Sequence, residues 1–408
     1  MSSKLFVSLS LLFCLFIAGC SQFVFSPLEK SEEGKAKSNK VVLANYSDLN
    51  GWSDDKLSQA LPAFLKSCTK IAKREHSKPF VAKNRNLLGL EVGRIGHWQY
   101  LCKIAKTLDH RASPDAVRQY FEKYFKPYKL VSVAGGLVTG YYEPTLRGSW
   151  TKTNRFYVPL YKKPKDLVSV NLGKFLPELA TKTVHGRVEN QQLVPYWSRE
   201  DIYNGMLVNR GLDLLWVDSL VDAFFLQIQG SGVVLLPGGE RVRVGYAGKN
   251  GLPYFAIGRD LIKSGAISKQ RMSMDSIKAW LAKNPKKGLE LMKKNKSFIF
   301  FRLLKGDGPL GAQGVVLTPG RSIAVDRNFI PLGVPIWLDT IHPLKGNKPL
   351  RRLVVAQDTG GAIRGPTRAD FFWGAGSQAG KKAGFMKNIG TMHLLLPRLH
   401  NQKQQFFD

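Results

Sequence analysis

The sequence lacks the residue spacings by which most metal and nucleotide sites are recognised. Its seven histidines show neither HxxxH nor HExxH spacing, and its four cysteines include no CxxC pair, so no metal site is predicted. No GKS or GKT follows a glycine-rich segment, which argues against a phosphate-binding loop. A GxSxG segment is also missing, which disfavours a serine hydrolase. Other side chains must therefore carry any chemistry.

The N-terminus has the features of a bacterial export signal. Lys4 precedes an apolar run that is too short to span a bilayer, and this pattern predicts a signal peptide over residues 1–19. The run ends in IAGC, which resembles the lipobox of bacterial lipoproteins and predicts acylation of Cys20. The residue after Cys20 is Ser21, whereas an aspartate at this position would resemble an inner-membrane retention signal. The predicted location is therefore the outer membrane, facing the periplasm. Residues 20–44 are predicted to be the lipidated N-terminus and a polar tether.

Acidic residues are few, with 30 Asp and Glu against 61 Lys and Arg and a formal net charge of +31. Such an excess favours an anionic partner, although a generally basic proteome would also explain it. The basic residues are scattered, with no zinc-finger, helix-turn-helix or RNP signature, and an exported lipoprotein is separated from DNA. Nucleic acid is therefore not the predicted partner. The remaining candidates for an anionic partner are the carboxylates of the cell wall and anionic lipid head groups.

Only two cysteines remain once the signal peptide and the lipidated residue are set aside. Cys68 and Cys102 lie in segments with helical periodicity. In an oxidising periplasm they could form a disulfide, and two buried thiols are the alternative.

A length of 408 residues with 44% hydrophobic content predicts two domains. Helical periodicity is confined to the early part, where helices are expected over 53–76, 96–110 and 113–128, the last beginning at Ser113. After Val131, short alternating segments separated by Gly, Pro and Asn predict strands and hairpins.

The β-rich part consists of two stretches of predicted strands with one helical segment between them. VVLLPGGERVRVGY predicts a hairpin over 233–246 with Gly238 and Gly239 at its turn. A helical segment over 272–295, capped by Ser273, is expected to mark a domain boundary. The strands that follow have the Pro and Gly corners of a small barrel. The N-terminal helices are expected to pack on this barrel, and a long ligand would lie in a cleft between the two barrels.

Two aspartates stand twelve positions apart in AQDTGGAIRGPTRADFFWG, residues 356–374. Asp358 precedes two glycines, where an aspartate is commonly a turn former. Asp370 directly precedes three aromatic residues, and desolvation there would raise its pKa toward that of a proton donor. Asp370 is therefore the candidate general acid.

Six segments, in order, give the sequence its likeness to a known family. Spread over nearly all of residues 45–400, they resemble the membrane-bound lytic murein transglycosylase A family. The segments are DLNGWSDDKLSQALPAFLKSC, TGYYEP, FFLQIQGSG, RVGYAGKNGLPYFAIGR, GVVLTPGRSIAVDRNFIPLG and DTGGAIRGPTRADFFWG.

The resemblance implies a mainly β fold, in which a double-psi β-barrel holds three aspartates and carries a second, inserted β-barrel. On this basis the helical first part of the barrel domain is placed at 45–138. The inserted barrel is placed at 139–294 and the double-psi part at 295–408. The N-terminal helices would pack on the first barrel, with the substrate groove between the domains.

The resemblance also implies an activity and its residues. Such enzymes cut the peptidoglycan glycan strand between N-acetylmuramic acid and N-acetylglucosamine without water, leave a 1,6-anhydro-muramoyl end and need no cofactor. The family's catalytic aspartate matches Asp370, and its companions match Asp358 and Asp326. Glycan strands, the lipid anchor and complexes of cell-wall synthesis are the implied partners.

One carboxylic acid suffices for this reaction, because the C6 hydroxyl of the sugar attacks C1. Asp370 would protonate the leaving oxygen and then take the hydroxyl proton. Asp358 would stabilise the developing cation or orient Asp370, unless it is only a turn residue. Asp326 would assist, or be held in an ion pair with a basic neighbour.

Aromatic and amide side chains are the expected sugar contacts. Alternation places Gln227 and Gln229 on one face of a strand, which would be a cleft wall or a solvated sheet face. Glu143 could replace Asp358 as the helper. The candidate binding residues are Tyr141, Tyr142, Glu143, Gln227, Gln229, Tyr246, Asn250, Thr359 and Trp373.

Two alternatives remain open. A muramidase would use Asp370 with Asp358 or Glu143 to hydrolyse the same glycan, and it would release reducing ends. A non-catalytic lipoprotein would bind peptidoglycan on the same barrel without cutting it.

Overall fold

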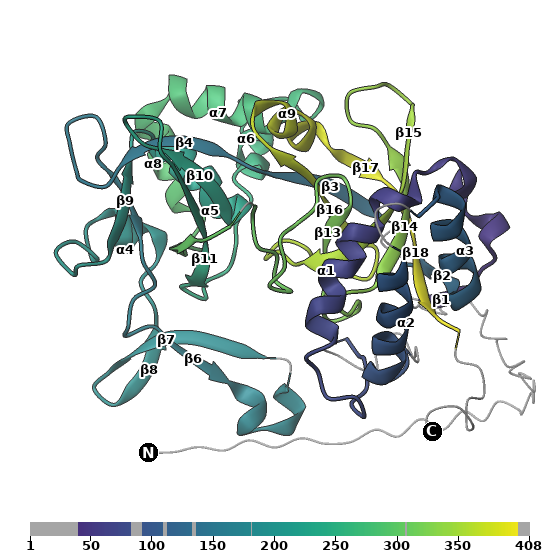
Figure 1. Ribbon diagram of the computed structural model, residues 1–408. Coiled ribbons are helices and arrows are strands. Elements are labelled where there is room, and N and C mark those ends of the chain that lie inside the picture. Colours follow the sequence, from purple (N-terminus) through teal and green to yellow (C-terminus); the bar gives the residue numbers. More distant parts are fainter. Residues whose placement is uncertain are drawn as a thin grey trace, which may run out of the picture. The chain divides into compact units, whose positions relative to one another are not determined.

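The computed structural model of the chain describes residues 40–82, 92–108, 112–132, 136–180, 182–306 and 308–398 (Figure 1). The predicted signal peptide, the predicted lipidation site Cys20 and nearly all of the predicted tether lie outside these residues. Among the described helices, none has both the length and the apolar character needed to cross a bilayer.

Three α-helices form the early part of the chain. The first is shorter than the expected 53–76, because the chain enters it through three short 3-10 helices and Pro62 stands in its first turn. Ser113 caps the third helix as predicted, since its Oγ accepts the Ala116 N–H at 3.1 Å. The elements are η1 (Tyr46–Asp48), η2 (Trp52–Asp54), η3 (Leu57–Gln59), α1 (Leu61–Ile71), α2 (Ile95–Thr107) and α3 (Pro114–Tyr124).

Cys68 of α1 and Cys102 of α2 form a disulfide, with their Cα atoms 5.5 Å apart. Both residues are buried, and the bond links the two helices where they pack on each other. Of the two alternatives that the sequence left open, the structure therefore contains the disulfide.

The first domain is built on a nine-stranded mixed sheet. β13 runs parallel to β15 and β16 runs parallel to β3, whereas the other neighbours are antiparallel. The Thr340 Oγ1 of β14 donates to the Ile389 carbonyl of β17 at 2.8 Å, which closes the curled sheet. The order is β1 (Lys40–Leu43), β2 (Phe125–Val131), β18 (Thr391–Pro397), β14 (Pro335–Ile341), β15 (Pro349–Asp358), β13 (Ser322–Val325), β16 (Arg368–Ala375), β3 (Leu137–Glu143) and β17 (Lys387–Ile389).

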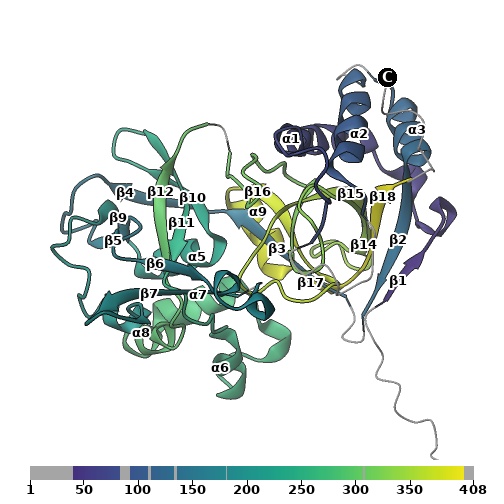
Figure 2. The ribbon, with the colours of Figure 1, turned by 90° about the horizontal axis from the view of Figure 1, so that it is seen from below.

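The N-terminal helices pack on this barrel as expected. Phe64 of α1, Trp98 of α2 and Phe121 of α3 share one buried cluster with Trp337 of β14. α9 (Ser377–Phe385) joins β16 to β17. Figure 2 shows the three helices beside β2, β14 and β18.

A six-stranded sheet forms the inserted domain. Lys162, directly after its edge strand β5, makes a bridge to Phe301 of the other edge strand, β12, so this sheet also closes. The predicted hairpin is confirmed, with Gly238 and Gly239 at positive φ in its turn. The order is β12 (Ile299–Leu304), β11 (Arg241–Lys249), β10 (Ser231–Leu235), β4 (Thr145–Ser149), β9 (Asp213–Val217) and β5 (Val158–Tyr161).

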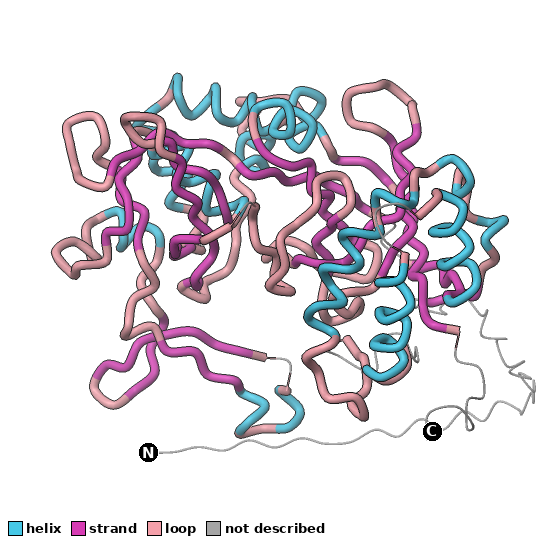
Figure 3. Tube along the Cα trace, in the orientation of Figure 1, coloured by secondary structure: helices cyan, strands magenta, loops and turns pink. Residues whose placement is uncertain are grey.

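A small three-stranded sheet and several helices complete the insert (Figure 3). The sheet consists of β6 (Val168–Asn171), β7 (Thr183–Glu189) and β8 (Gln192–Pro195). The helices are η4 (Leu172–Lys174), η5 (Pro177–Leu179), α4 (Arg199–Tyr203), α5 (Leu220–Gln229), α6 (Gly258–Lys263), η6 (Lys269–Arg271), α7 (Met274–Lys283) and α8 (Pro285–Lys293).

The prediction that Gln227 and Gln229 lie on a strand is wrong, because both lie at the end of helix α5. The Ser219 Oγ caps that helix by accepting the Asp222 N–H at 3.1 Å, and Gly230 ends it at a φ of 83°. An N-cap serine and a left-handed C-terminal glycine stabilise a helix even in an apolar segment.

The helical segment 272–295 does not divide the two β-rich parts. Ser273 caps α7 as predicted, but α7 and α8 pack against α5 in one apolar cluster. The chain then returns to the six-stranded sheet as β12. It crosses between the two sheets at Pro144 and after Leu304, later than the expected 139 and 294.

Candidate active site

Asp358 and Asp370 flank a single residue of strand β13. Ala324 is the Cα partner of Asp358 on one side and of Asp370 on the other. Directly opposed residues of paired strands point to the same face of a sheet, so the two carboxylates share a face. Two strand spacings put their Cα atoms about 10 Å apart.

Asp370 is held by a short chain of side chains from β3 and β16. The Thr139 Oγ1 donates to its Oδ1 at 2.5 Å, and the Arg368 Nη2 donates to the same Thr139 oxygen at 2.8 Å. Burial raises the pKa of Asp370 to about 6, with a smaller contribution from the Asp358 charge, while Thr139 and Arg368 oppose the rise. Its Oδ2 accepts no hydrogen bond from any described residue and remains available to a substrate.

Asp358 is better supplied with donors than Asp370. Its Oδ2 accepts from the Tyr141 hydroxyl at 3.0 Å. Its Oδ1 accepts from the backbone N–H groups of Ala312, at 2.9 Å, and Thr359, at 2.8 Å. Burial still raises the pKa of Asp358, and these three hydrogen bonds limit the rise by stabilising the carboxylate.

Asp326 lies in the turn after β13 and is 3% exposed. Its Oδ1 accepts the Asn328 N–H at 3.0 Å and its Oδ2 accepts the Gly365 N–H at 2.9 Å. Of the two alternatives left open for Asp326, the ion pair is not formed with any described residue, and backbone N–H groups bind both oxygens. Asp326 joins its own turn to the loop between β15 and β16, and so fixes the loop that leads into Asp370.

The three candidate residues within TGYYEP, Tyr141, Tyr142 and Glu143, have different surroundings. Tyr141 lies beside Phe372, and its hydroxyl reaches Asp358. Tyr142 packs instead in a small cluster with α9. Glu143 is 1% exposed, and its Oε2 accepts from the Arg243 Nη1 of the inserted barrel at 2.5 Å. Glu143 is therefore an interdomain ion-pair partner, which weakens its case as a helper acid.

The amide candidates are mostly engaged with the protein. Gln229 accepts the Tyr142 N–H at 3.1 Å, which ties α5 to β3. Asn250 is fully buried, and its amide bonds the carbonyls of Trp197 and Lys296 and the Phe298 N–H. The third amide candidate, Gln227, is buried, and the aromatic candidate Tyr246 is 48% exposed on β11.

Trp373 does not lie with the aspartates. It stands three residues after Asp370, on the opposite face of β16, and packs against Phe371 with its Nε1–H directed at the Met386 sulfur. Thr359 is half-buried next to Asp358.

Sequence reasoning missed Thr139 and Arg368, which contact the candidate acid directly or through one atom. Both lie in segments that the sequence analysis had singled out. The pairing of β3 with β16, which places Thr139 opposite Asp370, is not visible in either segment alone. A desolvated carboxylic acid beside a hydrogen-bonded carboxylate is an arrangement found in enzymes that cleave glycosidic bonds.

The comparisons with known proteins agree with this class. Residues 137–302 match the model of the MltA specific insert domain, and residues 321–396 match that of the 3D domain. The chain is 34% identical to a membrane-bound lytic murein transglycosylase A homolog of Buchnera aphidicola, over 72% of this chain and 75% of the relative. The chain therefore belongs to the membrane-bound lytic murein transglycosylase A family.

Two solved structures extend the likeness. A membrane-bound lytic murein transglycosylase from Agrobacterium tumefaciens superposes with a TM-score of 0.78 at 31% identity, covering 88% of this chain and 98% of that chain. E. coli MltA with bound chitohexaose gives a TM-score of 0.58 at 28% identity, covering 74% of this chain and 84% of that chain. The mainly β, two-domain fold expected from the sequence is thereby confirmed.

Proposed function

We propose that this chain is a lytic transglycosylase that cuts peptidoglycan glycan strands between N-acetylmuramic acid and N-acetylglucosamine, forming 1,6-anhydro-muramoyl ends. The observation that carries the proposal is Asp370. Its pKa of about 6 lets it gain and lose a proton near neutral pH, and its Oδ2 accepts no hydrogen bond from any described residue.

In the first step Asp370 acts as a general acid. Its Oδ2 donates a proton to the glycosidic oxygen while the bond from that oxygen to C1 breaks, and the bonding electrons leave with the oxygen. Positive charge develops at C1. The Asp358 carboxyl group, on the same sheet face and with three donors that favour its charged form, would stabilise this charge through space.

In the second step Asp370 acts as a general base. The C6 hydroxyl of the muramoyl residue bonds to C1, and its proton passes to the Asp370 carboxylate. The acid is thereby restored and no water is consumed. The Thr139 hydroxyl steadies the carboxylate between the two steps, because a hydrogen bond to the ionised form favours that form.

The relatives support the substrate and the location. A β-1,4-linked N-acetylglucosamine oligomer, chitohexaose, binds the E. coli protein, which favours a glycan strand as the ligand here. The relatives are named membrane-bound, and the sequence ahead of the described domains offers Cys20 as a lipid-bearing residue. We therefore assign the chain to the outer membrane, facing the periplasm, with peptidoglycan as its partner.

Incubation of purified peptidoglycan with a soluble form beginning at Ser21 tests the proposal. The new glycan ends are identified by mass, with Asp370→Asn alongside. The expected products are lighter by one water than reducing ends, and the variant is expected to lose at least about 1,000-fold in rate while still binding the glycan.

The other outcomes identify the alternatives. Reducing ends that depend on Asp370 would make the chain a muramidase. Intact glycan with retained binding, in the wild-type chain itself, would make it a peptidoglycan-binding lipoprotein without this activity.

A further inference from the structure

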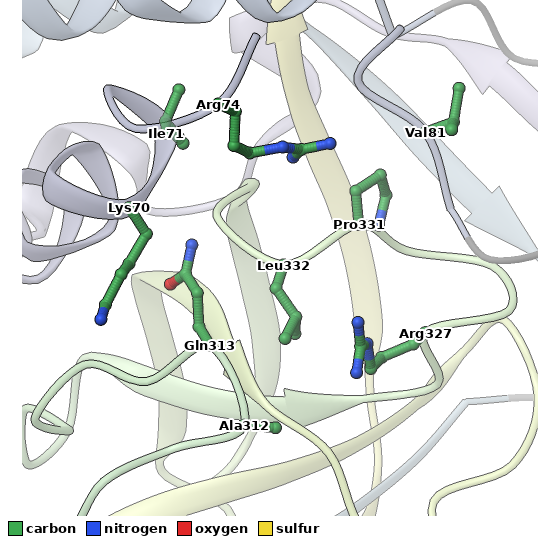
Figure 4. A pocket seen from close by; sticks show the side chains of 9 residues that line it. All are labelled: Lys70, Ile71, Arg74, Val81, Ala312, Gln313, Arg327, Pro331 and Leu332. Atoms are coloured by element: carbon green, nitrogen blue, oxygen red, sulfur yellow. The ribbon is translucent and has the colours of Figure 1, made fainter. Parts of the chain in front are cut away.

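A pocket of about 340 Å³ lies between the end of α1 and two loops of the double-psi part of the barrel (Figure 4). Helix α1 and the segment after it supply one wall, and the loops at 312–313 and 327–332 supply the other. The lining residues are Lys70, Ile71, Arg74, Val81, Ala312, Gln313, Arg327, Pro331 and Leu332.

The charge of this pocket is one-sided. Among the described residues, Lys70, Arg74 and Arg327 line it and no aspartate or glutamate does. None of the three makes an ion pair with a described residue. The Gln313 Oε1 is occupied by the Ser67 hydroxyl at 2.8 Å, which leaves the Gln313 Nε2 as a further donor. Cations and an amide donor around one pocket favour an anion.

The apolar residues narrow the choice of anion. Ile71, Pro331 and Leu332 line the pocket beside the cations. An inorganic phosphate would leave these side chains without a partner, whereas a carboxylate on an aliphatic chain would contact both kinds of surface.

The pocket adjoins the catalytic carboxylates. Ala312 lines it, and the N–H of the same residue donates to the Asp358 Oδ1 at 2.9 Å. Arg327, on the other wall, directly follows Asp326, which holds the loop leading into Asp370. The pocket therefore shares the Ala312 segment with Asp358 and the turn at 326–327 with Asp326.

We propose that this basic pocket is a subsite for the stem peptide of a muramoyl residue and binds one of its carboxylates. The proposal rests on the proposed function, because it requires a glycan strand at Asp370. Peptide stems carry carboxylates on short aliphatic side chains, in keeping with the cationic and apolar lining of the pocket. The subsite would let the enzyme distinguish glycan that bears peptides from glycan that does not.

The test compares two soluble glycan substrates, one with its stem peptides and one stripped of them by an amidase. Lys70→Gln/Arg74→Gln removes two pocket charges away from the catalytic aspartates. Lys73→Gln/Lys106→Gln is the matched control, because these exposed lysines on the same helical layer do not line the pocket.

For the pocket variant, the KM on peptide-bearing strands is expected to rise about tenfold, a change of about 1.4 kcal/mol, with kcat unchanged. Its KM on stripped strands, and both parameters of the control, are expected to stay within about twofold of wild type. A free stem peptide should compete for wild type and not for the pocket variant.

Equal losses on both substrates, or no loss on either, would overturn the proposal. A loss of binding to vesicles of anionic phospholipid, with discrimination between the two glycans retained, would also overturn it and assign the pocket to lipid phosphate. Failure of the proposed function is a separate result: wild type would release no anhydro ends from stripped strands, whatever the pocket variants do.

Discussion

The barrel holds carboxylates in two regions that differ in how their burial is compensated. On the β13–β15–β16 face, Asp370 accepts one hydroxyl, and burial raises its pKa to about 6. In the turn after β13, Asp326 is buried too, but backbone N–H groups occupy both of its oxygens. Desolvation with few donors gives a carboxyl group that gains and loses protons near neutral pH. At Asp326, where backbone N–H groups bind both oxygens, the buried carboxyl group instead links two loops.

The largest effect on stability is expected from Asp326→Ala. The variant leaves the N–H groups of Asn328 and Gly365 without their acceptors, and the free energy of unfolding should fall by about 3 kcal/mol. Urea denaturation at neutral pH measures this, and Asp326→Asn, which keeps an acceptor oxygen, should lose less. Unchanged stability combined with a complete loss of cutting would place Asp326 among the catalytic groups and break the comparison.

Asp358→Asn should lower kcat by about 30-fold, because the amide keeps an acceptor for Ala312 and Thr359 but removes the negative charge facing C1. The charge of Asp358 also raises the pKa of Asp370. The alkaline limb of kcat/KM should therefore move to lower pH in the variant. A pH–rate profile of released anhydro ends measures both effects, and an unchanged profile would reduce Asp358 to a turn residue.

Asp370→Asn should be more stable than wild type at pH 8, by on the order of 2 kcal/mol. The folded-state pKa of Asp370 lies above the ordinary aspartate value of 3.8, so the folded chain binds the proton more tightly. Wild-type stability therefore falls as the pH rises from 3.8 through about 6, and the asparagine variant lacks this loss. Thermal unfolding of both proteins at pH 3.5 and pH 8 checks it, and equal differences at the two pH values would contradict the assignment.

Local patterns in the sequence correctly predicted the helix caps and the hairpin turn. Ser113 and Ser273 cap their helices, and Gly238 and Gly239 form the hairpin turn, because each depends on residues within a few positions. Asp370 was singled out because aromatic residues follow it directly, but of these only Phe372 shares its face of β16 by alternation, so the burial of Asp370 comes from the fold and not from that run.

The contacts around Asp370 that depend on strand pairing could not be predicted from the sequence. Thr139 contacts Asp370 only because β3 pairs with β16 across 231 residues of chain. Two errors were avoidable. Strand alternation already places Trp373 on the face opposite Asp370. Ser219 followed three residues later by an acidic residue is a helix start, which would have placed Gln227 and Gln229 on a helix.

The smallest expected effect comes from Thr139→Val, which keeps the shape of the side chain and removes the donor to Asp370. The hydrogen bond lowers the pKa of Asp370, so its loss should raise that pKa and move the alkaline limb of kcat/KM to higher pH. We expect kcat to fall only about fivefold, since one neutral hydroxyl contributes roughly 1 kcal/mol. The shift is opposite in sign to that of Asp358→Asn, and the double variant should therefore return the limb toward the wild-type position. Shifts of the same sign in the two single variants would show that the raised pKa of Asp370 does not arise from the balance between burial and its neighbours.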